Sequence, residues 1–151
     1  MQVDFFNASN GFDKKAIHGG IYQVELIMKS KVTEPISLYI GESVWIAVRC
    51  AQHLYSVFEN PMYFGLSRDD LENDDLILKF KVLDSVEDKK SLIGVGRYKQ
   101  KELEYIKKLE PLTQLDTSDR QLKDNKKKYE KVQKEMEKRG YKIQMCHQFT
   151  L

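Results

Sequence analysis

Residues 20–27, Gly-Ile-Tyr-Gln-Val-Glu-Leu-Ile, and residues 36–40, Ile-Ser-Leu-Tyr-Ile, decide the expected fold. Both stretches are rich in β-branched and aromatic residues, which favour strands. The turn-rich segment 29–35 between them is short for a crossover, so we expect an antiparallel hairpin. Pairing Tyr22 with Tyr39 would place both phenol rings on one face of the sheet.

Three further elements are expected along the chain. Apolar residues at helical spacing predict a helix after Gly41, with Ser43 as its N-cap. The apolar positions of this helix are Val44, Ala47, Val48, Ala51, Leu54, Tyr55 and Phe58. Alternating residues predict a half-buried strand over 76–83, and a second helix is expected at 96–109, before Pro111. The expected fold class is therefore α/β (α+β), a small three-stranded, mainly antiparallel sheet flanked by helices.

The end of the chain is strongly basic. Residues 120–142 hold ten Lys or Arg against four Asp or Glu, a net charge of +6 in a chain whose total is +2. We expect a basic helix from Asp119 to Gly140, with a thin apolar face made by Leu122, Tyr129, Val132 and Met136. The expected organisation is a domain at 1–115 and a basic helical extension at 116–151, packed on or following that domain.

Composition narrows the class of protein. A chain of 151 residues with 41% apolar residues suits one domain with its own core. Its apolar runs fall short of the roughly 20 residues of a membrane span, and its first residues lack the pattern of a signal peptide. We therefore expect a cytoplasmic protein with no membrane partner. Cys50, Cys146 and the three histidines lack the spacing of zinc ligands.

Two short motifs in the hairpin and two residues of the next helix follow one another in a defined order. The motifs are Gly20-Ile21-Tyr22 and Tyr39-Ile40-Gly41, and the helix carries Arg49 and His53 four residues apart on one side. This order resembles the signature of the GIY-YIG nuclease family. Either motif alone occurs by chance, so the resemblance depends on their order and on the expected elements around them.

The resemblance extends to the second half of the chain and covers roughly residues 19–114. Glu102 falls where the family places its metal-binding glutamate. Gln114 stands at the position of the family's late asparagine, and Gly41 closes the second motif, so both are further candidates for the site. The connection between the two motifs is longer than the usual family hairpin.

The resemblance implies a metal-dependent DNA endonuclease that hydrolyses phosphodiester bonds. Glu102 would hold one Mg²⁺ (or Mn²⁺) together with water and a phosphate oxygen. Arg49 would stabilise the negative charge that develops on the phosphate. Either Tyr22 or Tyr39 would act as the general base, and His53 would orient that tyrosine or take the proton itself.

The basic helix would add affinity for the DNA backbone without reading its sequence. The residues expected to make these contacts are Lys126, Lys127, Lys128 and Lys131.

Several alternatives stay open. The chain could be a nucleic-acid-binding module with the same fold that does not cut, and a metal titration would discriminate the two. The basic helix could be only a solvated face, or its apolar side could be the seam of a homodimer. Tyr22 and Tyr39 could be ordinary sheet aromatics, Arg49 and His53 solvated helix residues, and Glu102 a residue at the margin of an apolar stripe.

Overall fold

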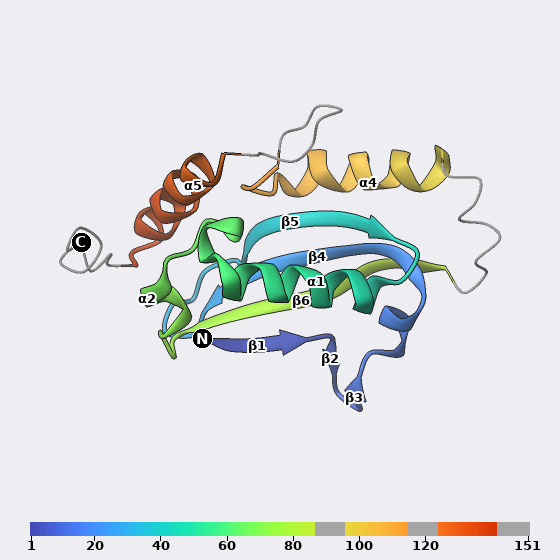
Figure 1. The fold of residues 1–151 in the computed structure, drawn as a ribbon, viewed down its shortest axis with the longest axis horizontal. Coiled ribbons are helices and arrows are strands. Elements are labelled where there is room, and N and C mark those ends of the chain that lie inside the picture. Colours follow the sequence, from blue (N-terminus) through green and yellow to red (C-terminus); the bar gives the residue numbers. More distant parts are fainter. Residues whose placement is uncertain (87–95, 115–123, 142–151) are drawn as a thin grey trace.

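A four-stranded sheet forms the centre of the protein (Figure 1). The computed structural model describes residues 1–86, 96–114 and 124–141. The strands of the sheet are β1 (Gln2–Phe5), β4 (Gly19–Met28), β5 (Ile36–Ser43) and β6 (Leu76–Val86). Their order is β1-β6-β4-β5, with β1 parallel to β6 and the other neighbours antiparallel. A separate pair is formed by β2 (Asn7–Ala8) and β3 (Gly11–Phe12).

Helices pack around this sheet, so the expected α+β class is confirmed. The helices of the described residues are the 3-10 helices η1 (Lys14–Ile17) and η2 (Pro61–Phe64) and the α-helices α1 (Ile46–Glu59), α2 (Arg68–Leu71), α4 (Gly96–Leu109) and α5 (Asn125–Lys138). The bounds of α4 agree with the helix expected at 96–109, and β6 contains the strand expected at 76–83. Helix α5 begins at Asn125 with Asp124 as its N-cap, so it starts later than the basic helix expected from Asp119; Leu122 lies outside the described residues.

The expectation of three strands is wrong, because β1 adds a fourth. This strand is only four residues long and pairs with a distant part of the chain, Val3 opposite Leu78 and Phe5 opposite Phe80. A local pattern carries no signal for such a partner. The strand gains its stability from packing against β6, where the Phe5 and Phe80 rings lie 5.4 Å apart.

The hairpin forms as expected, but the expected register is wrong. Tyr22 lies opposite Gly41 and Val24 lies opposite Tyr39, with a β-bulge between Val24 and Glu25. Because side chains two residues apart share a face, both tyrosines still point to the same side of the sheet. The shift has a steric reason, since the large Tyr22 ring needs a partner residue without a side chain.

Helix α1 turns a different face to the core than the sequence pattern predicts. Its buried residues are Ile46, Cys50, His53 and Val57, which recur at helical spacing. Val48 is 56% exposed and Tyr55 is 69% exposed, so this part of the expected apolar stripe faces outward, whereas Ala47 and Leu54 are partly buried against the core. Both sides of this helix are apolar, and periodicity alone does not decide between them. The helix also begins at Ile46 with Trp45 as N-cap, while Ser43 Oγ accepts a hydrogen bond from the Trp45 backbone N–H at 3.1 Å.

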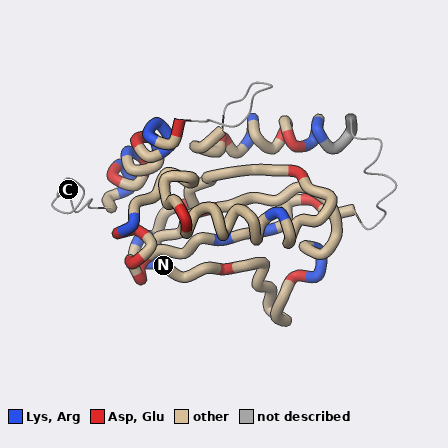
Figure 2. Tube along the Cα trace, viewed as in Figure 1, with Lys and Arg blue, Asp and Glu red and all other residues tan. Residues whose placement is uncertain are grey.

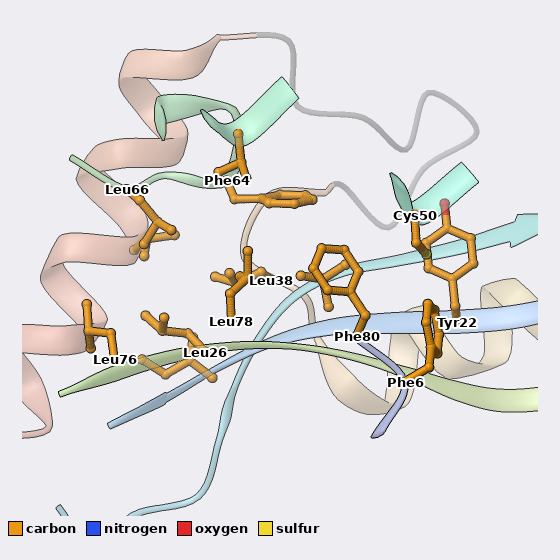
Figure 3. Close-up of a cluster of buried hydrophobic side chains, with 14 of the residues drawn as sticks. Phe6, Tyr22, Leu26, Leu38, Cys50, Phe64, Leu66, Leu76, Leu78 and Phe80 are labelled. Atoms are coloured by element: carbon orange, nitrogen blue, oxygen red, sulfur yellow. The ribbon is translucent and has the colours of Figure 1, made fainter. Parts of the chain in front are cut away.

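The two faces of the sheet carry two separate apolar clusters. The larger cluster joins β4, β5 and β6 to β1, α1, η2 and α5. Figure 3 shows Tyr22 and Cys50 at one end of it, Leu66 and Leu76 at the other, and Phe80 between. The smaller cluster contains Ile21, Ile40 and Ile106 of α4. Ile21 and Ile40 are sequence neighbours of Tyr22 and Tyr39, so α4 packs on the face opposite the tyrosines.

The basic helix α5 belongs to the larger cluster. Val132 and Met136 are fully buried there, which leaves no apolar seam at these residues for a second copy. The dimer-seam alternative is therefore wrong for Val132 and Met136. Helix α5 can pack closely against Gly65, at φ 72°, because this residue has no side chain. A Cβ there would lie 2.6 Å from the Lys128 carbonyl oxygen. Gln133 Nε2 also donates to Asp70 Oδ2 at 2.8 Å.

A short segment after α4 runs beside β5. The Leu112 backbone N–H donates to the Ser37 carbonyl at 3.0 Å, and the Thr113 N–H donates to the Leu38 carbonyl at 3.1 Å. This segment ties the end of α4 to the hairpin. Within the described ranges, no helix has the length and apolar character that crossing a membrane requires.

Candidate active site

A continuous chain of hydrogen bonds joins Tyr22, His53 and Tyr63. The Tyr22 hydroxyl lies 2.7 Å from His53 Nε2, and the Tyr63 hydroxyl lies 2.7 Å from His53 Nδ1. Tyr22 is 1% exposed and His53 is fully buried, whereas Tyr63 is half-buried. Each nitrogen of the imidazole therefore has its own phenol partner, and the ring is held from both sides.

Three elements supply these residues. Tyr22 comes from β4 and His53 from the inward face of α1, whereas Tyr63 comes from η2. Asn60 caps η2 by accepting from the Met62 N–H at 3.2 Å, and Pro61 fixes the first residue of the turn. The chain thus turns back directly after α1, which brings Tyr63 against a residue of the preceding helix.

Gly41 makes room for the Tyr22 ring. A Cβ at this position would lie 2.3 Å from the Tyr22 hydroxyl oxygen and 2.8 Å from a ring carbon of Tyr39. Real Cβ contacts do not become that short, so the phenol crosses β5 only because residue 41 has no side chain. This is a structural reason for glycine in the second motif.

Tyr39 lies beside this chain on the same face of the sheet. Its ring stacks on that of Tyr22 with centroids 6.1 Å apart, and its centroid is 4.8 Å from that of His53. Tyr39 is half-buried, whereas Tyr22 is closed off from solvent. The structure therefore brings together Tyr22, Tyr39, Gly41 and His53.

Burial governs the protonation of this cluster. Burial, together with the positive charges of Arg49 and Lys128, lowers the pKa of His53 to about 3. Burial also raises the pKa of Tyr22 well above its usual value, and Tyr39 raises it further. At neutral pH the imidazole and the Tyr22 phenol are accordingly both uncharged, and one His53 nitrogen donates while the other accepts.

Arg49 lies one helical turn before His53 on α1, but on the exposed side. Because Arg49 is exposed, solvent and a ligand can reach its guanidinium. The Nη1 atom donates to Gln52 Oε1 at 3.1 Å. The positive charge of Arg49 lowers the pKa of His53 and also lowers the pKa of Tyr22. A positive group therefore borders the buried cluster from the solvent side.

Glu102 comes from α4, whose residue Ile106 packs on the other face of the sheet. Glu102 is 8% exposed, and its helix α4 lies alongside the strand β5 (Figure 1). Among the described residues, no group of three or more His, Cys, Asp or Glu could hold a metal ion. One carboxylate, completed by water and substrate phosphate, is a ligand set that suits Mg²⁺. Glu102 would be the single protein ligand of such an ion, on a helix that packs against the face of the sheet opposite Tyr22 and Tyr39.

Gln114 has a structural partner in the backbone of β5. Its Oε1 accepts from the Ile40 N–H at 2.8 Å, and its Nε2 donates to the Ile40 carbonyl at 2.6 Å. Both ends of the amide are therefore engaged by the strand next to Tyr39. In this arrangement Gln114 fixes the position of β5.

The four candidate lysines of α5 have two different environments. Lys126, Lys127 and Lys131 are exposed, and Figure 2 shows basic and acidic residues mixed along this helix. Lys128 is 3% exposed, donates from Nζ to the Tyr63 carbonyl at 3.2 Å, and lies 5.0 Å from the centre of the Tyr63 ring. Its burial lowers the pKa of the ammonium. Lys128 is thus turned toward the tyrosine cluster and away from a nucleic-acid backbone.

Tyr63 is the member of the cluster that the sequence does not indicate. It belongs to neither motif, and it follows Pro61, which marks the end of a helix in a sequence pattern. The local signal that does exist is Asn60-Pro61, a capped turn that folds the chain back over α1. Nothing in that signal specifies which side chain meets His53.

Neither a protein-family model, nor a curated protein, nor a solved structure matches this chain.

Proposed function

We propose that this protein is a metal-dependent endonuclease that hydrolyses phosphodiester bonds in DNA, as the resemblance to GIY-YIG nucleases implies. The observation that carries the proposal is the convergence of Tyr22, Tyr39 and His53 over Gly41. These residues stand far apart in the sequence, and the two motifs meet on one face of the sheet. An arginine within electrostatic range borders the same cluster.

Tyr39 is the tyrosine that we assign as general base. Tyr39 is half-buried, whereas the Tyr22 hydroxyl is closed off from solvent and bonded to His53. A phenol with an ordinary pKa near 10 needs nearby positive charge to act at neutral pH. Arg49, whose charge already acts on Tyr22 and His53, would supply that charge. Tyr22 and His53 would hold the ring of Tyr39 in place from behind.

Arg49 and Glu102 complete the assignment. The exposed guanidinium of Arg49 would bind non-bridging phosphate oxygens and stabilise the charge that builds on them. Glu102 would hold one Mg²⁺ or Mn²⁺, and such an ion supplies Lewis-acid stabilisation of phosphate when it is bound.

The test uses the pure protein with supercoiled plasmid and with duplex, single-stranded and branched oligonucleotides, in Mg²⁺, Mn²⁺ or EDTA. We expect nicking or cutting that requires the divalent ion. Arg49→Ala and Glu102→Gln should each reduce the cleavage rate by about 10²–10³-fold, because each removes charge stabilisation from the transition state. Glu104→Gln is the matched control, since Glu104 lies on the exposed side of the same helix.

Two outcomes would contradict the proposal. Loss of activity in Glu104→Gln with full activity in Glu102→Gln would show that the metal ligand is misassigned. Binding of DNA without cleavage in every metal would favour the non-cutting nucleic-acid-binding module. Circular dichroism of each variant separates a lost function from a lost fold.

A further inference from the structure

The tautomer of His53 follows from what its two phenol partners can do with their own protons. A neutral imidazole carries one N–H and one acceptor nitrogen. Tyr22 bonds to Nε2 and Tyr63 bonds to Nδ1, both at 2.7 Å. The N–H therefore points either to Tyr22 or to Tyr63, and these two choices differ in what they leave unsatisfied.

An N–H on Nε2 would leave the Tyr22 hydroxyl proton without an acceptor. Tyr22 is 1% exposed, and its hydroxyl bonds to His53 Nε2 within the described part of the chain. A buried donor without a partner is costly. With the N–H on Nδ1, the Tyr22 O–H donates to Nε2, and Tyr63 accepts at Nδ1. Tyr63 is half-buried, so its own O–H can turn toward water.

Neighbouring residues hold Tyr63 in place beside His53. Lys128 reaches from α5, donates to the Tyr63 carbonyl at 3.2 Å and places its ammonium 5.0 Å from the centre of the ring. The Tyr63 ring also contacts Phe64, with centroids 4.9 Å apart. The phenol oxygen is therefore presented to His53 by fixed neighbours on two sides.

We infer that Tyr63 is a positioning residue that accepts the Nδ1–H of His53 and fixes the tautomer in which Nε2 accepts from Tyr22. Tyr63 acts through His53 and Tyr22, which support the Tyr39 ring. Its role in cleavage rests on the proposed function. The tautomer itself does not, because it depends only on the hydrogen bonds and on the burial of Tyr22.

The first measurement is the tautomer of His53 by ¹⁵N NMR in the unmodified protein. His53→Gln identifies the signals of His53 among those of the three histidines. We expect a protonated Nδ1 and an unprotonated Nε2, the reverse of the preference of free histidine. A protonated Nε2 in the unmodified protein would overturn the inference, and this outcome needs no variant to fold.

The second measurement compares Tyr63→Phe with Tyr55→Phe. Tyr55 lies on the outward side of α1 and is 69% exposed, so its hydroxyl provides a matched control. Tyr63→Phe removes the acceptor for Nδ1–H and should give a mixture of tautomers, whereas Tyr55→Phe should leave the spectrum unchanged. An unchanged His53 spectrum in folded Tyr63→Phe would also overturn the inference.

Single-turnover cleavage at saturating DNA then tests the link to the reaction. Loss of one hydrogen bond should slow the chemical step about threefold to tenfold in Tyr63→Phe, with DNA affinity unchanged. An unaltered rate in that variant would refute a role for Tyr63 in positioning. Absence of cleavage in the unmodified protein would refute the proposed function, and the NMR result would still decide the tautomer.

Discussion

Replacing Gly41 by alanine tests the packing on which the candidate site depends. The added Cβ would lie 2.3 Å from the Tyr22 hydroxyl oxygen and 2.5 Å from Cζ of the same ring. Tyr22 must then move by roughly 1 Å to restore a normal contact, which breaks its 2.7 Å bond to His53. Overpacking costs about 1–3 kcal/mol, and loss of the buried bond costs a further 1–3 kcal/mol or so. Alanine regains about 0.5–1 kcal/mol of strand propensity.

We therefore expect Gly41→Ala to lower the free energy of unfolding by about 3 kcal/mol. For a chain of this size that corresponds to a fall in Tm of roughly 6–12 °C. Urea denaturation followed by circular dichroism measures the change, and the dependence of the unfolding free energy on urea should stay constant. A loss below about 1 kcal/mol would refute the steric reasoning.

A double-mutant cycle identifies the cause of the loss. In a Tyr22→Leu background the contacts with the Tyr22 ring are gone and only the 2.8 Å approach to the Tyr39 ring remains. The added methyl of Gly41→Ala should therefore cost clearly less there than in the unmodified protein. Equal destabilisation in both backgrounds would assign the effect to the Tyr39 ring or the β5 backbone and would exclude the contact with Tyr22 as its cause.

Two further predictions concern protonation and charge. Because the folded protein keeps His53 neutral down to a pKa of about 3, whereas the unfolded chain takes up a proton near 6.5, stability should fall as the pH drops from about 6.5 to about 3. His53→Gln should remove up to about 1.4 kcal/mol per pH unit of this slope in urea titrations, and an identical slope in both proteins would contradict burial of a neutral imidazole. Charge reversal at the exposed Lys126, Lys127 and Lys131 should lower the slope of log DNA affinity against log salt by about 0.9 for each lost phosphate contact, measured by fluorescence anisotropy. An unchanged salt slope would assign this side of α5 to solvent, whereas Lys128→Met should chiefly reduce stability, because Lys128 is buried against Tyr63.

Local patterns account for the parts of the fold that the sequence predicts. The hairpin follows from two β-rich stretches with a short connection, and α4 follows from periodic residues that end before a proline. Such signals depend on neighbours in the chain, and tertiary packing then reinforces them. Strand β1 has no such local signal, because its pairing with the distant strand β6 leaves no periodicity in the sequence.

The candidate site likewise has features that the sequence predicts and features that depend on tertiary packing. Tyr22, Tyr39 and His53 can be proposed from motif order, and the structure brings them together. The register of the hairpin depends on where the Tyr22 ring fits, and the ring fits opposite Gly41, which has no side chain. The outward apolar side of α1 and the partner of His53 depend on which neighbours cover each face. A sequence with apolar residues on both sides of a helix leaves that choice to the tertiary structure.

The segment that follows α4 has a consequence for self-association. Strand β5 stands at the margin of the sheet, and such a strand offers unpaired N–H and C=O groups to any other chain. The backbone N–H groups of Leu112 and Thr113 donate to the Ser37 and Leu38 carbonyls along this edge. The Gln114 amide is hydrogen-bonded to both the N–H and the carbonyl of Ile40. The Gln114 side chain forms the two hydrogen bonds with Ile40 that a neighbouring strand would form, and it adds no strand to the sheet. The β5 edge is thereby occupied between Ser37 and Ile40, and the hairpin that carries both tyrosines is protected from aggregation on that side.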